Sequence, residues 1–437
     1  MSFRLWVAPG PPGVLLLVRA AEELQVSVAK GSGLVPGPTR FAGVDWAKDD
    51  HVLCVVDGDG VVVERVAVAH TVAGLARLVR VLRRHQVVAV GIERGDGPVV
   101  DALLGAGLPV FVIAPGQVKA LRGRYGSVGN KDDRFDAFVL ADVVRTDRAR
   151  LRVLRPDTDQ TVLLRRLCRA RKALVGHRVA TSNQLRAHLD TALPAVVGLF
   201  SSLDAPISLA FLTRFATQDA LDKLTEARLS TWLARQRYSG RTSAATLLER
   251  IRSAPRGPVG VFAAGLAALS QALVATLSTL SQQIKTLERQ INAVFAAHPD
   301  RDIFANLPKA GTIRAARLLA EIGDARGRFP TPASLACLAG AAPSTRQSGR
   351  SRIVTFRWGA DKQLRDAVCD FAGDSPNANA WAADLYRRSR DRGHDYPHAV
   401  RILARAWLNV IWKCWTTRTP YDPAKHGQLQ HLLAQTG

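Results

Sequence analysis

The hydrophobic pattern between residues 40 and 70 favours strands rather than helices. Runs rich in β-branched residues begin near Phe41, His51 and Val61, and Gly58-Asp-Gly60 separates the last two. An Asp-Gly pair between two such runs is typical of a tight β-turn. This part of the chain is therefore predicted to form a hairpin or a meander.

Helices and strands are expected to alternate over the next 80 residues, because continuous apolar runs alternate with helically spaced stripes. The expected elements are a helix capped by Thr71 that runs to about Arg84, a buried strand at 87–92, a short helix near 99–104, a strand at 110–113 and a helix at 131–147. Strands first, then alternation, predict an α/β domain with a central mixed sheet.

The middle of the chain has helical periodicity and little polar chemistry. A helix at 163–189 carries basic residues around an apolar stripe, namely Arg165, Arg166, Arg169, Arg171, Lys172 and Arg178. Such a face is either solvated or in contact with phosphates. From Leu273 to Val294 the apolar residues step alternately by four and three, which favours a coiled-coil seam over an ordinary core helix. No role is predicted for residues 200–260.

A turn with a glycine opens the last part of the chain. Leu307-Pro-Lys-Ala-Gly-Thr312 precedes a helical run at 313–322. This pattern is typical of a helix-hairpin-helix element, whose turn offers backbone N–H groups to a phosphate, and an ordinary helix start is the alternative. Lys309 stands where such turns often have a first glycine. The aromatic residues between 380 and 415 are expected in a helical core.

The composition predicts a globular chain with a polyanionic partner. The 437 residues are 47% hydrophobic and 22% charged, with a formal net charge of +23, so nucleic acid is the first partner to consider. A membrane-surface protein would need a basic amphipathic helix or a lipidation motif, and neither is found. No segment is expected to approach a span of ~20 apolar residues. The five cysteines lack metal-ligand spacing and fit free thiols in the cytoplasm.

Four carboxylates are expected to converge in the α/β domain. Asp133 and Asp136 stand three apart on the helix at 131–147 and share a face. Asp45 lies on the first strand and Glu93 at the carboxyl end of a later one, where open α/β sheets concentrate their chemistry. Such a cluster is costly without a cation, and two Mg²⁺ ions there would suit phosphodiester cleavage. A solvated acidic helix start is the alternative.

Three motifs resemble a known family. Gly43-Val-Asp45-Trp-Ala-Lys48, Gly91-Ile-Glu93 and Lys131-Asp-Asp133-Arg-Phe-Asp136-Ala-Phe-Val-Leu-Ala141 resemble the DEDD transposases and site-specific invertases of insertion-sequence family 110. The resemblance implies an RNase H-like, RuvC-type catalytic domain with its tetrad at Asp45, Glu93, Asp133 and Asp136. Asp132 stands where the family more often has threonine or serine, and the spacing of three favours Asp133 with Asp136.

A serine-bearing segment extends the resemblance toward the C-terminus. Residues 335–352 contain Ala-Gly, Pro, Ser-Gly and then basic residues, in the order that the family's C-terminal transposase domain has. There a serine is taken to be the nucleophile that joins to DNA. The match implies Ser348, with Ser344 and Ser351 as the other candidates, whereas a loop that only grips phosphates is the alternative. The residues expected to contact nucleic acid are Lys309, Gly311, Arg350, Arg352 and Arg357.

The resemblance also implies an organisation and an activity. The expected segments are a weakly ordered extension at 1–38, a RuvC-like DEDD catalytic domain at 39–155, a helical and coiled-coil region at 156–300, a mainly α-helical C-terminal transposase domain at 301–425 and a tail at 426–437. The implied activity is Mg²⁺-dependent cleavage and strand exchange of the DNA of a bacterial insertion sequence. A homo-oligomer, dimer or tetramer, and guidance by an element-encoded bridge RNA are implied as well.

Three other functions fit parts of the pattern. A RuvC-type junction resolvase would share the tetrad but would not need a further domain with Ser348. An actin-like sugar kinase also opens with a Gly-Val-Asp strand but needs a second glycine-rich phosphate motif, which the sequence lacks. A basic nucleic-acid scaffold with a decayed active site is the non-enzymatic alternative, and the intact tetrad argues against it.

Overall fold

The computed structural model describes residues 39–125 and 132–436, so the extension expected at 1–38 lies outside the described residues. The chain forms two compact units, and the boundary in the sequence falls between Leu154 and Arg155.

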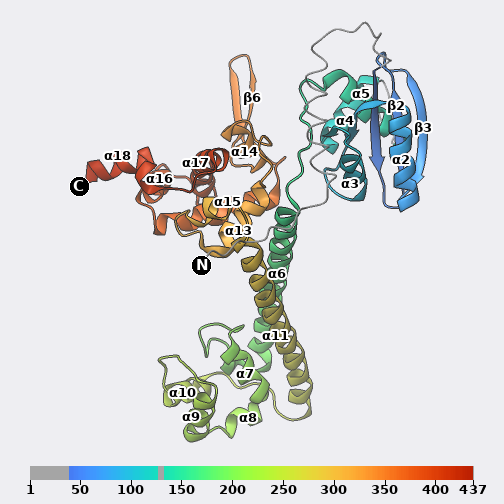
Figure 1. Cartoon of the computed structure of the whole chain (residues 1–437). Coiled ribbons are helices and arrows are strands. Elements are labelled where there is room, and N and C mark those ends of the chain that lie inside the picture. The colour runs from blue at the N-terminus through green and yellow to red at the C-terminus, as the bar shows by residue number, and fades with distance from the viewer. Residues whose placement is uncertain (1–38, 126–131, 437) are drawn as a thin grey trace, which may run out of the picture. The chain divides into compact units, whose positions relative to one another are not determined.

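The first unit contains a five-stranded mixed sheet in the order β3-β2-β1-β4-β5 (Figure 1). The strands are β1 (Arg40–Trp46), β2 (Asp50–Val56), β3 (Val62–Ala69), β4 (Val87–Ile92) and β5 (Val110–Val112). The first three form an antiparallel meander, while β4 is parallel to β1 and β5 is parallel to β4. The predicted mixed sheet is confirmed.

Helices pack on both faces of this sheet. They are α2 (Val72–Arg84), α3 (Pro98–Gly105), α4 (Pro115–Arg122) and α5 (Asp133–Asp147). One core gathers α2 and α3, and the other gathers α4 and α5. The Thr71 hydroxyl caps α2 as predicted, accepting from the Gly74 N–H at 3.1 Å. Helix α4 was not predicted, because its eight residues carry too short a periodic pattern.

The second unit is mostly helical, and two long helices dominate its first part. Helices α6 (Asp159–Ala192) and α11 (Val261–Ala296) lie side by side (Figure 1). Between them in the sequence is a lobe with its own core, built from α7 (Pro206–Arg214), α8 (Gln218–Asp222), α9 (Glu226–Arg235) and α10 (Ala244–Ser253).

The rest of the second unit folds around a tryptophan-rich core. Its helices are α12 (Arg301–Ala305), α13 (Gly311–Ile322), α14 (Pro332–Leu338), α15 (Lys362–Asp374), α16 (Ala380–Asp391), α17 (Tyr396–Thr417) and α18 (Gly427–Thr436). Trp381, Trp407 and Trp415 are buried in this core, as predicted, whereas the prediction is wrong for Tyr396, which is 57% exposed. The segment expected as a tail contains α18, and its Leu429 is also buried.

Two strands interrupt this helical part. Strands β6 (Ser344–Ser348) and β7 (Ser351–Thr355) form an antiparallel hairpin that extends from the second unit (Figure 1). The sequence predicted a loop at most here. Short 3₁₀ turns complete the secondary structure at Gly123–Tyr125, Pro194–Val196, Ser375–Asn377 and Pro423–Lys425.

The apolar stripe predicted as a coiled-coil seam packs against α6 of the same chain. Leu273 and Leu277 share a core with Leu185, and Ile291 shares another with Leu164.

By length and composition alone α11 could cross a membrane, which corrects the expectation that no segment approaches such a span.

Most basic residues on this face of α6 form ion pairs within the second unit. The ion pairs are Arg165–Asp157, Arg169–Glu321, Arg171–Glu288, Lys172–Asp366 and Arg178–Asp204. The structure therefore supports neither a solvated face nor a face that contacts phosphates, because these cations neutralise the chain's own carboxylates.

Candidate active site

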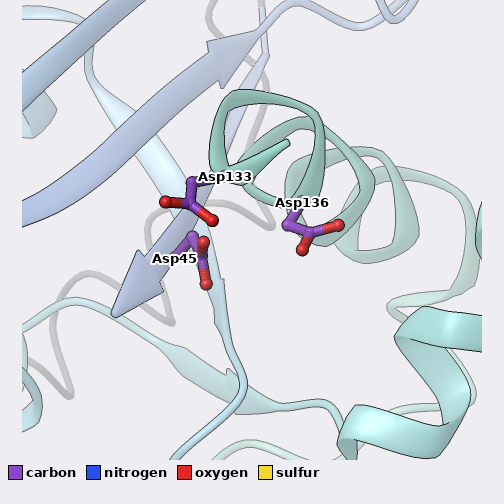
Figure 2. A group of neighbouring side chains, drawn as sticks. All are labelled: Asp45, Asp133 and Asp136. Atoms are coloured by element: carbon purple, nitrogen blue, oxygen red, sulfur yellow. The ribbon is translucent and has the colours of Figure 1, made fainter. Parts of the chain in front are cut away.

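Three carboxylates meet at one edge of the sheet in the first unit. Figure 2 shows Asp45 reaching from the strand end, and Asp133 and Asp136 from the first turn of α5. One oxygen of each lies within 4.8 Å of the other two. Asp136 is only 3% exposed, whereas Asp45 is half-buried and Asp133 is exposed. Three members of the predicted tetrad are thus brought together.

Two glycines let α5 approach the sheet closely enough for this cluster to form. Gly43 and Gly91 are partners on the parallel strands β1 and β4. A Cβ atom on Gly43 would lie 2.1 Å from the carbonyl oxygen of Ala137, and one on Gly91 would lie 2.6 Å from that of Leu140. Because these contacts are with backbone atoms, which cannot move aside singly, the close approach needs glycine at both positions.

Glu93 lies at the same edge of the sheet, one residue after β4. Val44 pairs with Ile92 in parallel register, so Asp45 and Glu93 are the next residues on neighbouring strands. Glu93 is half-buried and does not belong to the group of three carboxylates that meet within 4.8 Å. The register therefore places Glu93 next to the cluster without bringing its carboxylate into it.

Asp132 has a structural role that accounts for its place in the motif. It is the N-cap of α5, and its side chain accepts a hydrogen bond from the Arg134 N–H at 3.0 Å. Aspartate, threonine and serine are all good N-caps. A helix cap therefore suits the position that, in the resembled family, more often has threonine or serine.

Arg122, which sequence reasoning missed, holds the buried member of the cluster. Its Nε donates to Oδ1 of Asp136 at 2.6 Å, and its Nη2 donates to Oδ2. The two side chains are 22% and 4% exposed. A bidentate guanidinium offsets the cost of burying the carboxylate charge. Only recognition of α4, of which Arg122 is the last residue, would have suggested it.

Asp142, a further acidic residue of α5, has other partners. Asp142 accepts hydrogen bonds from the Tyr125 hydroxyl and, at 2.7 Å, from Nε of Arg145. Burial, followed by the hydrogen bond to Asp142, raises the pKa of Tyr125 above its ordinary value, so the phenol remains a donor. Asp142 anchors the helix and is not part of the cluster.

The donor set of the cluster fits a hard divalent cation. Asp45, Asp133 and Asp136 offer oxygen atoms, which Mg²⁺ prefers as ligands. Carboxylates this close repel one another unless positive charge lies between them. Arg122 hydrogen-bonds only Asp136 among the three.

Ser348 lies near the tip of the exposed hairpin in the second unit. It pairs with Ser351 across the two-residue turn Gly349-Arg350. Gly349 has a φ of 52°, the left-handed region that glycine adopts readily in such turns. Ser348, Arg350, Ser351 and Arg352 are exposed. Among the residues that the structure describes, none hydrogen-bonds the Ser348 hydroxyl.

Arg357 and Ser344 lie at the base of the hairpin. The Arg357 guanidinium donates from Nε to the carbonyl oxygen of Ala342 at 3.2 Å and from Nη2 to that of Pro343 at 3.1 Å. Ser344 is the first residue of β6 and is half-buried. In this structure Arg357 braces the hairpin.

The turn before α13 has the backbone of a glycine-rich turn. Lys309 and Gly311 have φ values of 62° and 59°, and both are exposed. Lys309 thus adopts the left-handed conformation that the first glycine of such turns supplies. Ala310, the N-cap of α13, has no side-chain acceptor, so it cannot cap the first N–H groups of the helix.

Comparisons with known proteins match both parts of the chain. A transposase family model of the DEDD, IS110 type matches residues 42–194, and a model for the transposase IS116/IS110/IS902 family matches residues 301–387. The chain is 33% identical over 401 residues to a mini-circle putative transposase for IS117 from Streptomyces coelicolor, across 88% of this chain and 95% of that protein.

Two further relatives come from other insertion elements. An uncharacterized 42 kDa protein of IS900 from Mycobacterium paratuberculosis is 30% identical, across 88% of this chain and 97% of its own. An uncharacterized 44.8 kDa protein of IS116 from Streptomyces clavuligerus is 29% identical, across 88% and 96%. The acidic cluster lies in the first matched range, and Lys309 and Ser348 lie in the second.

Proposed function

Because the chain belongs to the IS116/IS110/IS902 family of transposases, we propose that its first unit is an RNase H-like, RuvC-type domain that cleaves DNA. The convergence of three carboxylates, on the side of the sheet where two glycines admit α5, is the observation that carries this proposal. A pair of Mg²⁺ ions held by Asp45, Glu93, Asp133 and Asp136 would supply the charge that activates an attacking oxygen and stabilises a leaving one.

The burial of the cluster suggests different roles for its members. Asp133 is exposed and would face the phosphodiester, whereas Asp136 is buried and fixed by Arg122. Arg122 uses one lone pair on each oxygen of Asp136, so Asp136 would serve as a metal ligand through the lone pairs that remain.

We propose in addition a covalent step at Ser348. Its Oγ would attack phosphorus, and an Oγ–P bond would form as the bond from phosphorus to a deoxyribose oxygen breaks. The hydroxyl proton would end on that leaving oxygen. Because no described residue hydrogen-bonds the hydroxyl, the group that takes the proton first would come from outside the hairpin. Exposed Arg350 and Arg352 could grip the phosphate.

The wider activity is proposed from the family and from the charge. The chain would cut and exchange strands at the ends of a bacterial insertion sequence as a dimer or tetramer, guided by an element-encoded bridge RNA. A net charge of +23 supports binding to polyanions of either kind. Backbone N–H groups in the first turn of α13, beginning at Gly311, would hold a DNA phosphate.

A denaturing gel tests the two chemical steps together. Purified protein would be incubated with Mg²⁺, element-end DNA and the element's non-coding RNA, comparing wild type with Asp133→Asn and Ser348→Ala. The proposal expects a protein–DNA adduct that both variants lose, while Ser344→Ala and Ser351→Ala keep it. An adduct that persists in Ser348→Ala but is lost in Ser351→Ala would identify Ser351, on the other side of the turn, as the nucleophile.

A structure-specific nuclease without a covalent serine is the second candidate. The lack of a hydrogen-bonded base at Ser348, within the described part of the chain, favours it. Cleavage without an adduct, unchanged in Ser348→Ala and lost in Asp133→Asn, would establish this function instead.

A further inference from the structure

The lobe between α6 and α11 has no role in the proposed chemistry. We define it as the helical lobe, residues 195–257, which includes helices α7 to α10. It lies outside both ranges matched by the family models. Its core buries residues such as Phe211, Leu229 and Leu247, so the lobe is a well-packed element.

An arginine-lined cavity opens on the helical lobe. Its volume is about 640 Å³, and its lining includes Arg237, Arg241, Arg250 and the half-buried Tyr238. A cavity of this size accommodates a small organic ligand such as a nucleotide. Arg237 has a φ of 50° because it lies in the left-handed turn that ends α9, where the Tyr238 N–H donates to the carbonyl oxygen of Leu233 at 3.0 Å.

A second, smaller cavity lies along α9. Its volume is about 330 Å³, and its lining includes Arg214, Phe215, Arg228, Trp232 and Arg235. Arg228, Trp232 and Arg235 are spaced by four and three residues on α9 and share a face. Helix α9 ends at Arg235, and the next residues, Gln236 and Arg237, line the larger cavity. The C-terminal end of α9 therefore links the two cavities.

The arginines of the two cavities lack counter-ions. Among the described residues, none of these six guanidinium groups forms an ion pair with a carboxylate, and all six are exposed. Elsewhere in the same lobe Arg256 pairs with Asp222 through two hydrogen bonds. Three guanidinium groups around one concave surface repel one another, and an anion in the cavity would relieve that repulsion.

We propose that the helical lobe binds an unpaired DNA strand, with its phosphates on the arginines of both cavities and its bases against Tyr238 and Trp232. Duplex DNA presents its phosphates on a convex surface, whereas an unpaired strand can enter cavities and stack its bases on aromatic rings. The proposed cleavage and exchange of strands would expose such a segment. The choice of DNA over other nucleic acids rests on that proposed function. The binding of phosphates by the arginines does not depend on it.

Binding of a labelled single-stranded oligodeoxynucleotide, followed by fluorescence anisotropy, tests this proposal. The full-length chain would be used in EDTA, so that the result does not depend on cleavage. One variant carries Arg237→Gln, Arg241→Gln and Arg250→Gln. The matched control carries Arg77→Gln, Arg80→Gln and Arg83→Gln, which remove the same charge from exposed positions on α2. Circular dichroism would confirm that both variants remain folded.

The lobe variant is expected to bind the strand at least about tenfold more weakly than wild type. The slope of log affinity against log salt should decrease by about two, since three phosphate contacts at ~0.7 each are removed. An equal loss in the α2 control, or no loss in either, would overturn the proposal. A larger loss for duplex DNA or for RNA of the same sequence would overturn the assignment to an unpaired DNA strand. Because Asp133→Asn protein should bind like wild type, failure of the catalytic proposal would be seen separately.

Discussion

At the scale of single residues, the candidate site depends on what neutralises its buried carboxylate. Asp136 is nearly inaccessible, and the Arg122 guanidinium occupies both of its oxygens. The same carboxylate is a member of the cluster that fits a divalent cation. Arginine and metal would therefore both neutralise Asp136, since a bidentate pair uses only about two of the four lone pairs of a carboxylate, and each positive charge reduces what the other contributes.

We expect Arg122→Gln to destabilise the metal-free protein and to make it respond more strongly to Mg²⁺. Loss of the guanidinium leaves a buried charge without a partner, which costs about 3 kcal/mol in the free energy of unfolding. Mg²⁺ should restore more stability to the variant than it adds to wild type. Thermal unfolding in EDTA and in Mg²⁺ measures both effects. Arg124→Gln is the control, because Arg124 contacts Thr146 and not the cluster; equal Mg²⁺ shifts in all three proteins would contradict the expectation.

At the scale of elements, the distance between α5 and the sheet sets the geometry of the site. Gly43 and Gly91 lie opposite each other on β1 and β4, and both face the backbone of α5. Asp45 follows Gly43 by two residues on the same face of the strand. A helix held further from the sheet would therefore separate Asp133 and Asp136 from Asp45.

Gly43→Ala should strongly destabilise the first unit and abolish the DNA cleavage proposed for it. The new Cβ would lie 2.1 Å from the backbone of Ala137, so α5 would have to shift, at a cost of about 3 kcal/mol or more. Gly105→Ala is a matched control, since nothing lies within 4 Å of a Cβ at that position, the last of α3. It should be neutral or slightly stabilising. Urea unfolding compares the two, and similar midpoints would argue against a close approach at Gly43.

A buried histidine joins the start of α6 to the turn after α11. Nδ1 of His298 accepts from the Asp300 N–H at 3.0 Å, and Nε2 lies 2.8 Å from the Thr161 hydroxyl. Burial lowers the pKa of His298 from its ordinary value, although Asp300 and Asp324 act to raise it. The hydrogen bonds at this junction therefore need the neutral imidazole, in which Nδ1 can accept from the Asp300 N–H.

The second unit should therefore lose stability as the pH falls below about 6.5, the ordinary histidine value. In that range the unfolded chain takes up a proton at His298 before the folded chain does, so unfolding is favoured by at most about 1.4 kcal/mol per pH unit. Above about pH 6.5 His298 is neutral in both the folded and the unfolded chain, and its full contribution to stability is present. Urea unfolding between pH 5 and 7 measures the slope. His298→Gln should reduce the slope, and replacement of the exposed His177 should not.

The first unit was the more predictable of the two. The meander, the alternation that follows and the Thr71 cap depend on neighbouring residues, so local patterns predicted them. Helix α4 was too short to show a period, and Arg122 was missed with it. The β6–β7 hairpin was missed because its strands are exposed on both faces and lack apolar alternation.

At the scale of the whole molecule, the net charge overstates how many cations can reach a nucleic acid. The chain carries +23, but most basic residues on α6 are paired with carboxylates of the second unit. The exposed cations that remain include those of the helical lobe, the hairpin and the turn at Lys309. Binding and cleavage should therefore depend on separate groups.

Removal of divalent metal should abolish cleavage and leave DNA binding nearly unchanged. Binding rests on arginine and lysine, whereas cleavage is proposed to need the cation held by the carboxylates. Parallel gel-shift and cleavage assays in EDTA and in Mg²⁺ check this. Raised salt should instead weaken DNA binding, and cleavage should fall only because less DNA is bound. Equal cleavage in EDTA and Mg²⁺ would remove the metal from the mechanism.

Local patterns in the sequence predicted the order of the strands in the first unit, the spacing of its acidic residues and the family resemblance. Each of these is carried by residues within a few positions of one another. The three-dimensional packing was needed to show which carboxylates meet, that Arg122 covers Asp136, and that Lys172 pairs with Asp366. Such partners are 14 to 194 residues apart in the sequence. No local pattern encodes these pairings, since they form only when packing brings distant elements into contact.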